Sequence, residues 1–292
     1  MSKKDIPGNI LVTGSTGFIG KPLVRCLEQR GDTVHHFARS LGNDILDKSA
    51  FNTFLGKRID TVFHLAGLTF VPNSWSNPAE FYAVNSLGTQ RVLEYCRSVN
   101  AHMIYISAYV YGVPQYLPID EGHPIAPNNP YSHSKWLGEE LCRFYAANMG
   151  VNATILRGFN LYGPGQDKRF LLPKIIFQAK EGKEIVVEND TPRRDYLHVD
   201  DFVVACILAM QTPDQFRIFN VGSGYSLSVR EIIEAVVQAA GNSVGWRCTG
   251  EVRQNEIPDT VADCRAIRSE LGWKNTVSFG QSIFSLLEST RK

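Results

Sequence analysis

A tyrosine and a lysine four residues apart, Tyr131 and Lys135, are the strongest chemical signal in the chain. Residues at this spacing share one face of a helix, so both side chains can point into a single site. An ammonium group stabilises a nearby phenolate. We therefore expect Lys135 to lower the pKa of Tyr131 until this phenol exchanges protons near neutral pH. The pair predicts proton transfer at a hydroxyl or carbonyl group.

A third candidate is Ser107, at the end of the apolar segment 102–107. If this segment is a strand of a doubly wound sheet, its last residue lies where active-site groups project. The alternative is a serine that only satisfies local backbone groups.

A glycine-rich stretch at residues 14–20 follows an apolar segment at 10–12 and precedes a helical pattern at 22–29. Glycines permit a tight turn and let backbone N–H groups approach a pyrophosphate, and the helix N-terminus adds partial positive charge. Because the strand and helix flank it correctly, the stretch predicts dinucleotide binding rather than a purely structural turn. The cofactor-binding residues expected here are Gly14, Gly17, Phe18, Ile19 and Gly20.

The elements that must position these residues alternate between strand and helix. This alternation predicts an α/β fold, with a doubly wound, Rossmann-type parallel sheet covered on both faces. Strands are expected at 10–12, 33–38, 60–66, 102–107, 153–159 and 216–221, and helices at 22–29, 79–99, 131–149 and 201–210.

After residue 163 the pattern changes, with helices expected at 171–180, 229–240 and 282–288 and a short strand at 184–188. We predict a dinucleotide-binding domain formed by residues 1–163 plus 196–223. A smaller C-terminal α/β lobe, 164–195 plus 224–292, is expected to bind the substrate.

Composition narrows the function classes. The 292 residues carry a formal net charge of +1, which gives no reason to expect a nucleic-acid or membrane partner. The polar N-terminus holds no apolar stretch of signal-peptide length, so we expect a cytoplasmic protein.

The six cysteines are widely spaced and predict buried free thiols. No residue cluster has ligand spacing, so no metal is expected.

Taken together, the TGSTGFIG stretch, the YSHSK stretch that contains Tyr131 and Lys135, and Ser107 three residues before Val110-Tyr111-Gly112 resemble the extended short-chain dehydrogenase/reductase family, the nucleotide-sugar epimerases and dehydratases. The resemblance implies that Ser107, Tyr131 and Lys135 are catalytic. It also implies further cofactor contacts through Asp44, Ile45, Leu65, Ala66, Gly67 and Asn85, besides Tyr131 and Lys135.

The same resemblance implies a nucleotide-diphosphate sugar as substrate. Residues matching the family's substrate contacts are Thr69, Asn160, Arg194, Arg253 and Glu256. In this family the helices expected at 79–99 and 131–149 commonly pair across a two-fold axis, which implies a homodimer.

The choice of dinucleotide depends on Arg39, which follows the second predicted strand where an acid would favour NAD. A guanidinium there can pair with the 2′-phosphate of NADP. NADP(H) is therefore favoured and NAD remains possible, with a solvated surface arginine as the alternative. The short connection from Arg39 to Asp44 resembles that of the GDP-6-deoxy-4-ketohexose reductases.

Three activities stay open. Ala108 and Tyr109 stand where family dehydratases carry an acid, which argues against dehydration. We expect an NADPH-dependent reductase of a nucleotide-linked 4-keto-6-deoxyhexose. One alternative is a nucleotide-sugar 4-epimerase with tightly held NAD, and a second is a catalytically idle dinucleotide sensor. The sensor is disfavoured because all three expected catalytic residues are present, namely Ser107, Tyr131 and Lys135.

Overall fold

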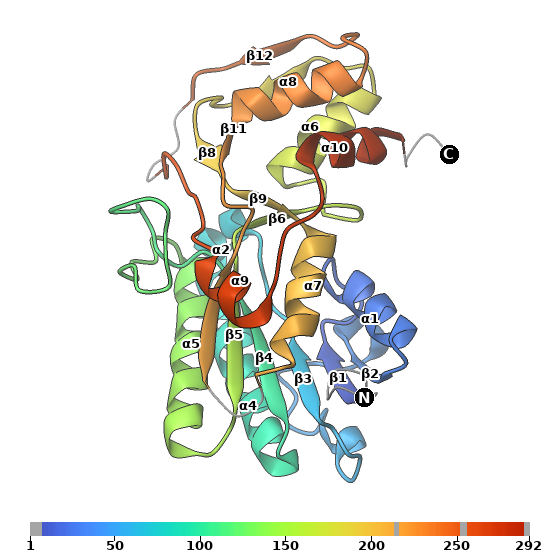
Figure 1. The fold of residues 1–292 in the computed structure, drawn as a ribbon, viewed down its shortest axis with the longest axis vertical. Helices are drawn as coiled ribbons and strands as arrows, with labels where there is room; N and C mark the ends of the chain where they lie inside the picture. The colour runs from blue at the N-terminus through green and yellow to red at the C-terminus, as the bar shows by residue number, and fades with distance from the viewer. Residues whose placement is uncertain (1–7, 213–215, 252–255, 289–292) are drawn as a thin grey trace.

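The computed structural model describes residues 8–212, 216–251 and 256–288 of the chain. Its larger part is a sheet covered by helices, and a smaller lobe lies above it in Figure 1. The sheet contains β1 Asn9–Thr13, β2 Thr33–Phe37, β3 Thr61–His64, β4 His102–Ser107, β5 Ala153–Gly158 and β10 Arg217–Val221. The principal covering helices are α1 Gly20–Gln29, α4 Gly88–Val99, α5 Pro130–Asn148 and α7 Val199–Ala209.

The six strands run parallel in the order β10-β5-β4-β3-β1-β2. The chain moves outward from β1 to β2 and then returns to place β3 on the other side of β1. This reversal creates a crevice at the carboxyl ends of β1 and β3, where ligands of such sheets bind. β2 is an edge strand, because it is the last strand in this order. Residues 38–60, which follow it and are all described, hold two short 3₁₀ turns but no strand. The predicted doubly wound parallel sheet is confirmed.

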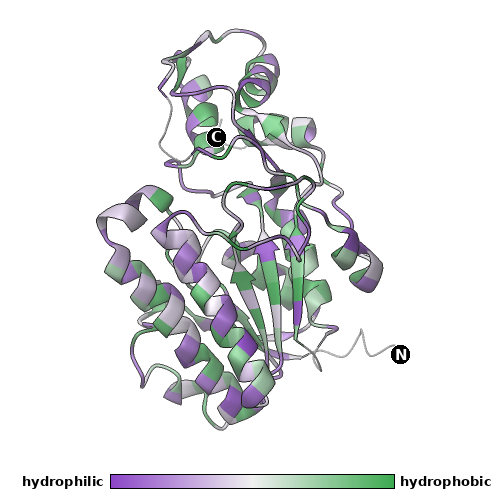
Figure 2. Ribbon diagram, turned by 90° about the vertical axis from the view of Figure 1, so that its left-hand side faces the viewer, coloured by the Kyte–Doolittle hydropathy of each residue, from purple (hydrophilic) through white to green (hydrophobic). Residues whose placement is uncertain are grey.

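Side chains alternate across the sheet, because successive strand residues point to opposite faces. Ile10 and Ile104 belong to the apolar layer that packs against α1 and α7. Leu11 and Met103 point the other way, into the layer that packs against α4 and α5. Figure 2 shows the hydrophobic strands with helices beside them. Burial on both faces explains why the strands appear in the sequence as nearly continuous apolar runs.

The helix predicted at 79–99 is three joined segments. These are α3 Pro78–Tyr82, a π-helical turn at Ala83–Leu87 and then α4. A further helix, α2 Val71–Ser76, precedes them and was not predicted. The π-helical turn contains Asn85, and such turns are frequent at functional sites.

The smaller lobe has its own apolar cluster. It is formed around Ile175, Ile232 and Ile283, which lie on α6 Leu171–Lys180, α8 Val229–Ala239 and α10 Phe279–Glu288. Two short strands, β7 Ile185–Val187 and β12 Trp246–Cys248, pair in parallel at its edge.

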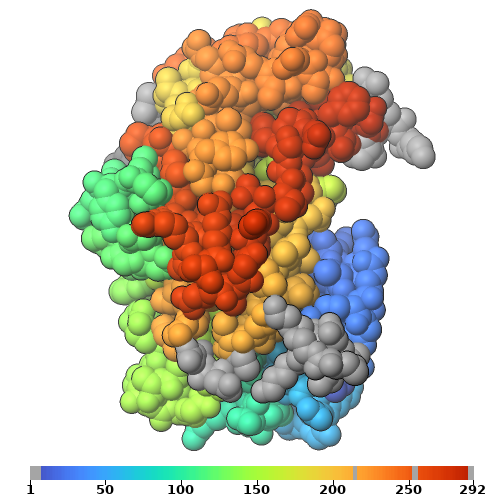
Figure 3. All heavy atoms as spheres, viewed as in Figure 1, coloured from blue at the N-terminus to red at the C-terminus, as the bar shows by residue number. Residues whose placement is uncertain are grey.

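One C-terminal helix, α9 Arg265–Leu271, belongs to a different cluster. Its Ile267 packs in the same apolar layer as α1 and α7, and the buried Trp273 donates from Nε1 to the Asp201 carbonyl at 2.9 Å. Figure 3 shows this segment in red across the front of the molecule, below the lobe. The domain boundaries given above remain a prediction.

Four very short strands complete the fold: β6 Asn160–Tyr162 pairs with β9 Tyr196–His198, and β8 Arg193–Arg194 pairs with β11 Leu227–Ser228. All six cysteines are free, as predicted. Four are buried, but Cys26 is only half-buried, and Cys248 is exposed because it lies on β12 at the edge of the lobe. Across the described ranges, no helix combines the length and the apolar character needed to cross a membrane.

Candidate active site

The glycine-rich turn connects β1 to α1 at the crevice. Gly14 has a φ of +70°, and a side chain there would come within 2.8 Å of the Ala66 backbone nitrogen. A side chain at Gly20 would collide with the Gly14 carbonyl oxygen. The chain therefore needs glycine at both positions to bring β1, the turn and α1 this close together. Gly17 completes the turn by donating from its N–H to the Gly14 carbonyl at 2.9 Å.

The start of α1 is suited to an anion. Ile19, preceded by Phe18, is its N-cap residue; no side chain caps the helix and its first turn holds no acid. The helix dipole is therefore not neutralised by the protein itself. In the same turn the Ser15 hydroxyl is buried and has no hydrogen-bond partner in the described part of the chain. A buried hydroxyl without a partner is costly, so a ligand that reaches it would be stabilised.

Arg39 lies just beyond β2, as the sequence predicted. It is exposed and opens a 3₁₀ turn after Ala38, and no acid stands at this strand end. Next to it, Thr16 of the glycine turn and Ser40 share a hydrogen bond of 2.8 Å between their hydroxyls. The structure therefore places Arg39 next to a serine that is hydrogen-bonded to the glycine turn.

Asp44 and Ile45 follow in the same connection. Asp44 accepts a hydrogen bond of 2.8 Å from the Leu46 N–H, which fixes the turn. Ile45 is buried against Gly88, where a side chain on that glycine would come within 3.0 Å of Ile45 Cγ2. Whether these two residues flank an adenine stays a prediction.

The segment after β3 contains Leu65, Ala66 and Gly67. Thr13 of β1 holds it, accepting from the Ala66 N–H through Oγ1 at 3.2 Å and from the Leu65 N–H through its carbonyl at 3.2 Å. A side chain on Gly67 would stand 3.0 Å from Asn85 Oδ1 and 4.0 Å from Lys135 Nζ. The structure thus brings three predicted groups, Gly67, Asn85 and Lys135, to one place.

Asn85 is oriented from both sides. Its Oδ1 accepts from the Leu68 N–H at 2.9 Å, and its Nδ2 donates to the Leu68 carbonyl at 3.0 Å and to Ser134 Oγ at 2.9 Å. It therefore ties the segment after β3 to the helix that carries the predicted catalytic pair.

Tyr131 and Lys135 lie in the first turns of α5, which Asn129 caps by accepting from the Ser132 N–H at 2.9 Å. Lys135 is buried, with Nζ 4.2 Å from the ring centroid of Tyr105. In the described residues its ammonium has no hydrogen-bond acceptor. Burial lowers the pKa of Lys135 to about 7, against the opposing effect of the Glu139 carboxylate.

The expected lowering of the Tyr131 pKa is wrong for this structure. Burial raises the pKa of Tyr131 above its usual value. The physical reason is that desolvation penalises the phenolate, while Lys135 is itself close to losing its charge. Tyr131 is therefore held as a phenol, the form that gives up a proton.

Ser107 ends β4, as predicted, and is buried. Its hydroxyl donates to Glu139 Oε1 at 2.5 Å. Glu139 in turn forms a buried ion pair with Arg157 of β5, with 2.6 Å between Oε2 and Nη2. Glu139 and Arg157 were not among the residues predicted from the sequence. The available signal was the spacing of Tyr131, Lys135 and Glu139, each four residues after the one before.

Of the predicted substrate residues, Arg194 and Glu256 are brought together, with 2.5 Å between Nη2 and Oε1. Asn160 lies at the start of β6 and donates from Nδ2 to the Asp195 carbonyl at 3.2 Å. Arg253 lies outside the described residues.

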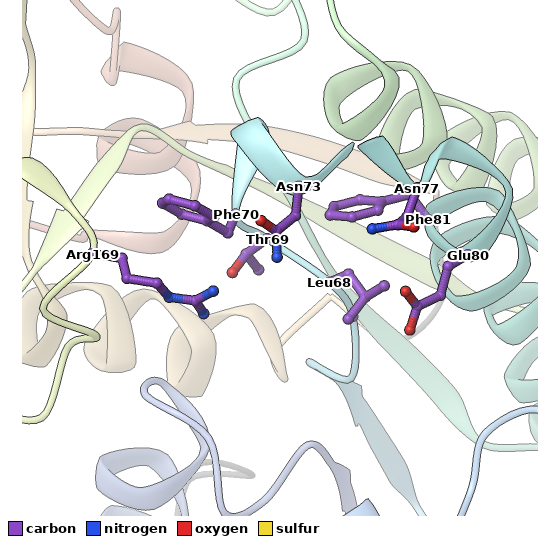
Figure 4. A pocket seen from close by; sticks show the side chains of 9 residues that line it. Leu68, Thr69, Phe70, Asn73, Asn77, Glu80, Phe81 and Arg169 are labelled. Atoms are coloured by element: carbon purple, nitrogen blue, oxygen red, sulfur yellow. The ribbon is translucent and has the colours of Figure 1, made fainter. Parts of the chain in front are cut away.

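A pocket of about 250 Å³ opens beside Gly67. Figure 4 shows Phe70 and Arg169 side by side at one end, Glu80 at the other, and the predicted substrate residue Thr69 between them. The Arg169 guanidinium stacks 4.6 Å from the Phe70 ring centroid. Phe81, which also lines the pocket, meets the Tyr131 ring edge-on with centroids 6.3 Å apart. Phe81 therefore links the wall of this pocket to the ring of the predicted proton donor.

Residues 10–222 match the model of the NAD dependent epimerase/dehydratase family. The chain belongs to this family.

A relative from Aggregatibacter actinomycetemcomitans, a GDP-6-deoxy-D-talose 4-dehydrogenase, is 30% identical over 97% of both chains. The structure of RMD from Pseudomonas aeruginosa with NADPH is similar with a TM-score of 0.88 and 28% identity, covering 96% of this chain and 97% of that one. The UDP-glucose 4-epimerase from Thermotoga maritima with UDP-glucose has a TM-score of 0.90 and 27% identity, covering 97% and 98%.

A nicotinamide dinucleotide, the cofactor of the epimerase/dehydratase family, fits the residues that are present. The glycine turn cannot accept side chains, Ser15 has an unused buried hydroxyl, and Lys135 has an ammonium without an acceptor in the described ranges. The described residues contain no cluster of His, Cys, Asp and Glu that could hold a metal ion.

Proposed function

We propose that the chain is an NADPH-dependent reductase of a nucleotide-linked 4-keto-6-deoxyhexose. The observation that carries the proposal is the end of β2, where Ala38 and Arg39 stand in place of an acid. An acid there would repel a 2′-phosphate, whereas the Arg39 guanidinium pairs with it. The relative that acts as a GDP-6-deoxy-D-talose 4-dehydrogenase and the NADPH complex of RMD support this choice.

In the proposed reduction, each residue of the site has a separate role. A bound nicotinamide supplies the hydride that C4 of the sugar receives. Tyr131 donates its phenolic proton to the oxygen on C4 and recovers a proton from solvent. Lys135 hydrogen-bonds the nicotinamide ribose and, when charged, stabilises the tyrosinate left behind. Arg194 and Glu256 bind the diphosphate and ribose of the sugar nucleotide, and Asn160 and Thr69 contact the sugar.

The protonated state of Tyr131 suits this direction. Reduction of a ketone starts with a proton donor, and a phenol whose pKa is raised by burial carries the proton that this step needs. Oxidation of a hydroxyl would instead start with a phenolate. A 4-epimerase with tightly held NAD is the second candidate, because the Thermotoga maritima epimerase aligns with almost the whole chain at a TM-score of 0.90.

The test mixes purified protein with NADPH and a panel of GDP-, UDP- and dTDP-linked 4-keto-6-deoxyhexoses, and follows nicotinamide absorbance. Loss of one NADPH per ketone with one member supports the reductase and names its substrate. Interconversion of C4-epimeric nucleotide sugars without added cofactor, and no NADPH loss, overturns the reductase in favour of the epimerase. Inactivity in both assays, with cofactor still bound, points to the dinucleotide sensor.

A further inference from the structure

The hydroxyl of Ser107 is joined to a buried ion pair. Arg157 approaches Glu139 with two nitrogens, Nη2 at 2.6 Å from Oε2 and Nε at 3.0 Å from Oε1. Both residues are almost fully buried, at 1% exposed for Glu139 and 2% for Arg157. Arg157 therefore donates to both oxygens of Glu139, and the carboxylate acts as the hydrogen-bond acceptor in this cluster. Ser107 Oγ lies 2.5 Å from Oε1 and donates its hydrogen bond to Glu139.

A chain of further hydrogen bonds, which starts at Arg157, holds the ion pair in place. Arg157 Nη1 donates to the Tyr111 hydroxyl at 2.8 Å, and this hydroxyl donates to Asn220 Oδ1 at 2.6 Å. Asn220 Nδ2 then donates to the Ile119 carbonyl at 2.9 Å. Because each of these groups has its partner, the Glu139 carboxylate is held in one orientation.

Glu139 is also part of the catalytic helix face. It follows Lys135 by one turn of α5, and Lys135 follows Tyr131 by one turn. The same carboxylate thus contacts the serine on β4 and acts electrostatically on the lysine one turn before it.

We propose that Glu139 is a positioning residue that makes Ser107 a hydrogen-bond acceptor toward the substrate. A serine hydroxyl has one donor and two acceptor sites. With the donor taken by Glu139, Ser107 can accept from Tyr131 or from a sugar hydroxyl, but it cannot donate to a sugar ketone. The proton that reaches the C4 oxygen then comes from Tyr131. This inference rests on the proposed function, because it concerns the same reaction.

The test is a double-mutant cycle with wild type, S107A, E139Q and S107A/E139Q. Single-turnover hydride transfer is measured with NADPH and the ketone found active in the panel. S107A should slow transfer on the order of a hundredfold. E139Q should slow it about tenfold in the wild-type background and less than about twofold when Ser107 is already absent. E140Q is the matched control, since Glu140 is the next residue of α5 and its side chain is 46% exposed.

Thermal unfolding of the same four proteins tests the contact without any sugar. The shift in Tm for the double variant should be smaller than the sum of the two single shifts. Additive shifts overturn the proposal whatever the activity, and they can be read even if no ketone is reduced and the proposed function fails. Coupled Tm shifts with multiplicative rate losses also overturn it, because Glu139 would then act only on the fold.

A second variant covers the case in which E139Q does not fold. E139D keeps a negative charge opposite Arg157, but its carboxylate is one methylene shorter and cannot reach both Arg157 and Ser107 in the present geometry. E139D should slow hydride transfer in the wild-type background and have little effect in the S107A background. Equal slowing in both backgrounds would contradict the positioning role.

Discussion

The Arg194 guanidinium lies 2.5 Å from the Glu256 carboxylate, although the two residues are 62 positions apart in the chain. Arg194 comes from β8, and its Nη1 also donates to the Ile257 carbonyl at 2.5 Å. The side chains of the pair are 19% and 20% exposed. Both were predicted as substrate residues, so the structure brings together two groups that the sequence could only name separately.

This pairing leads to a prediction about substrate affinity. R194A should raise the KM for the sugar nucleotide about tenfold or more and leave kcat nearly unchanged, because a diphosphate contact acts equally on ground state and transition state. Steady-state kinetics with the active ketone measures both constants. R217A is the control, since Arg217 pairs with Glu270 on the surface at 3.2 Å. A fall in kcat as large as the fall in kcat/KM would place Arg194 in the chemical step.

The proton donor is tested by Y131F. This change removes only the phenolic hydroxyl, so turnover should fall by about 10²–10⁴-fold while NADPH binding stays largely intact. Hydride transfer and cofactor titration are measured on the same preparation. Y82F serves as control, because it removes a tyrosine hydroxyl that contacts His133 at 3.1 Å, two residues along α5 from Tyr131. A loss of cofactor affinity as large as the loss of rate would argue against Tyr131 as the donor.

The sheet and its glycine turn could be predicted because the cause is local. Strands buried on both faces must be apolar throughout, and a turn that approaches Ala66 this closely must carry glycine at position 14. The helix of Tyr131 and Lys135 was predictable for the same reason, since four-residue spacing fixes a shared face.

Other features depend on contacts distant in sequence, which composition and periodicity do not encode. The helix α9 was not predicted, and Ile267 on it packs under the sheet rather than in the lobe. The ion pair of Glu139 and Arg157 joins a helix to a strand 18 positions away, and either charge alone resembles a surface residue. The direction of the Tyr131 pKa was wrong because it depends on how deeply the fold buries the phenol.

Cofactor choice can be tested at Arg39. R39A should weaken NADPH binding about tenfold or more and change NADH binding much less, because only NADPH carries the 2′-phosphate. Fluorescence titration with both cofactors measures the ratio. R58A is the control, an exposed arginine whose partner is Asp60 at 2.9 Å. Equal weakening of both cofactors would show that Arg39 does not pair with the 2′-phosphate.

The pH dependence of stability follows from Lys135. Burial lowers its pKa from 10.5 to about 7, so between these values the unfolded chain holds a proton that the folded chain has released. The free energy of unfolding should therefore rise with pH in this window. Relative to K135M, the cofactor-free wild type should gain about 2 kcal/mol between about pH 7.5 and about pH 9. Urea unfolding at both pH values measures this, and K174M, at an exposed position of α6, should follow the wild type. If K135M and the wild type gain equally, Lys135 keeps its charge in the folded protein and Tyr131 lies beside a permanent ammonium.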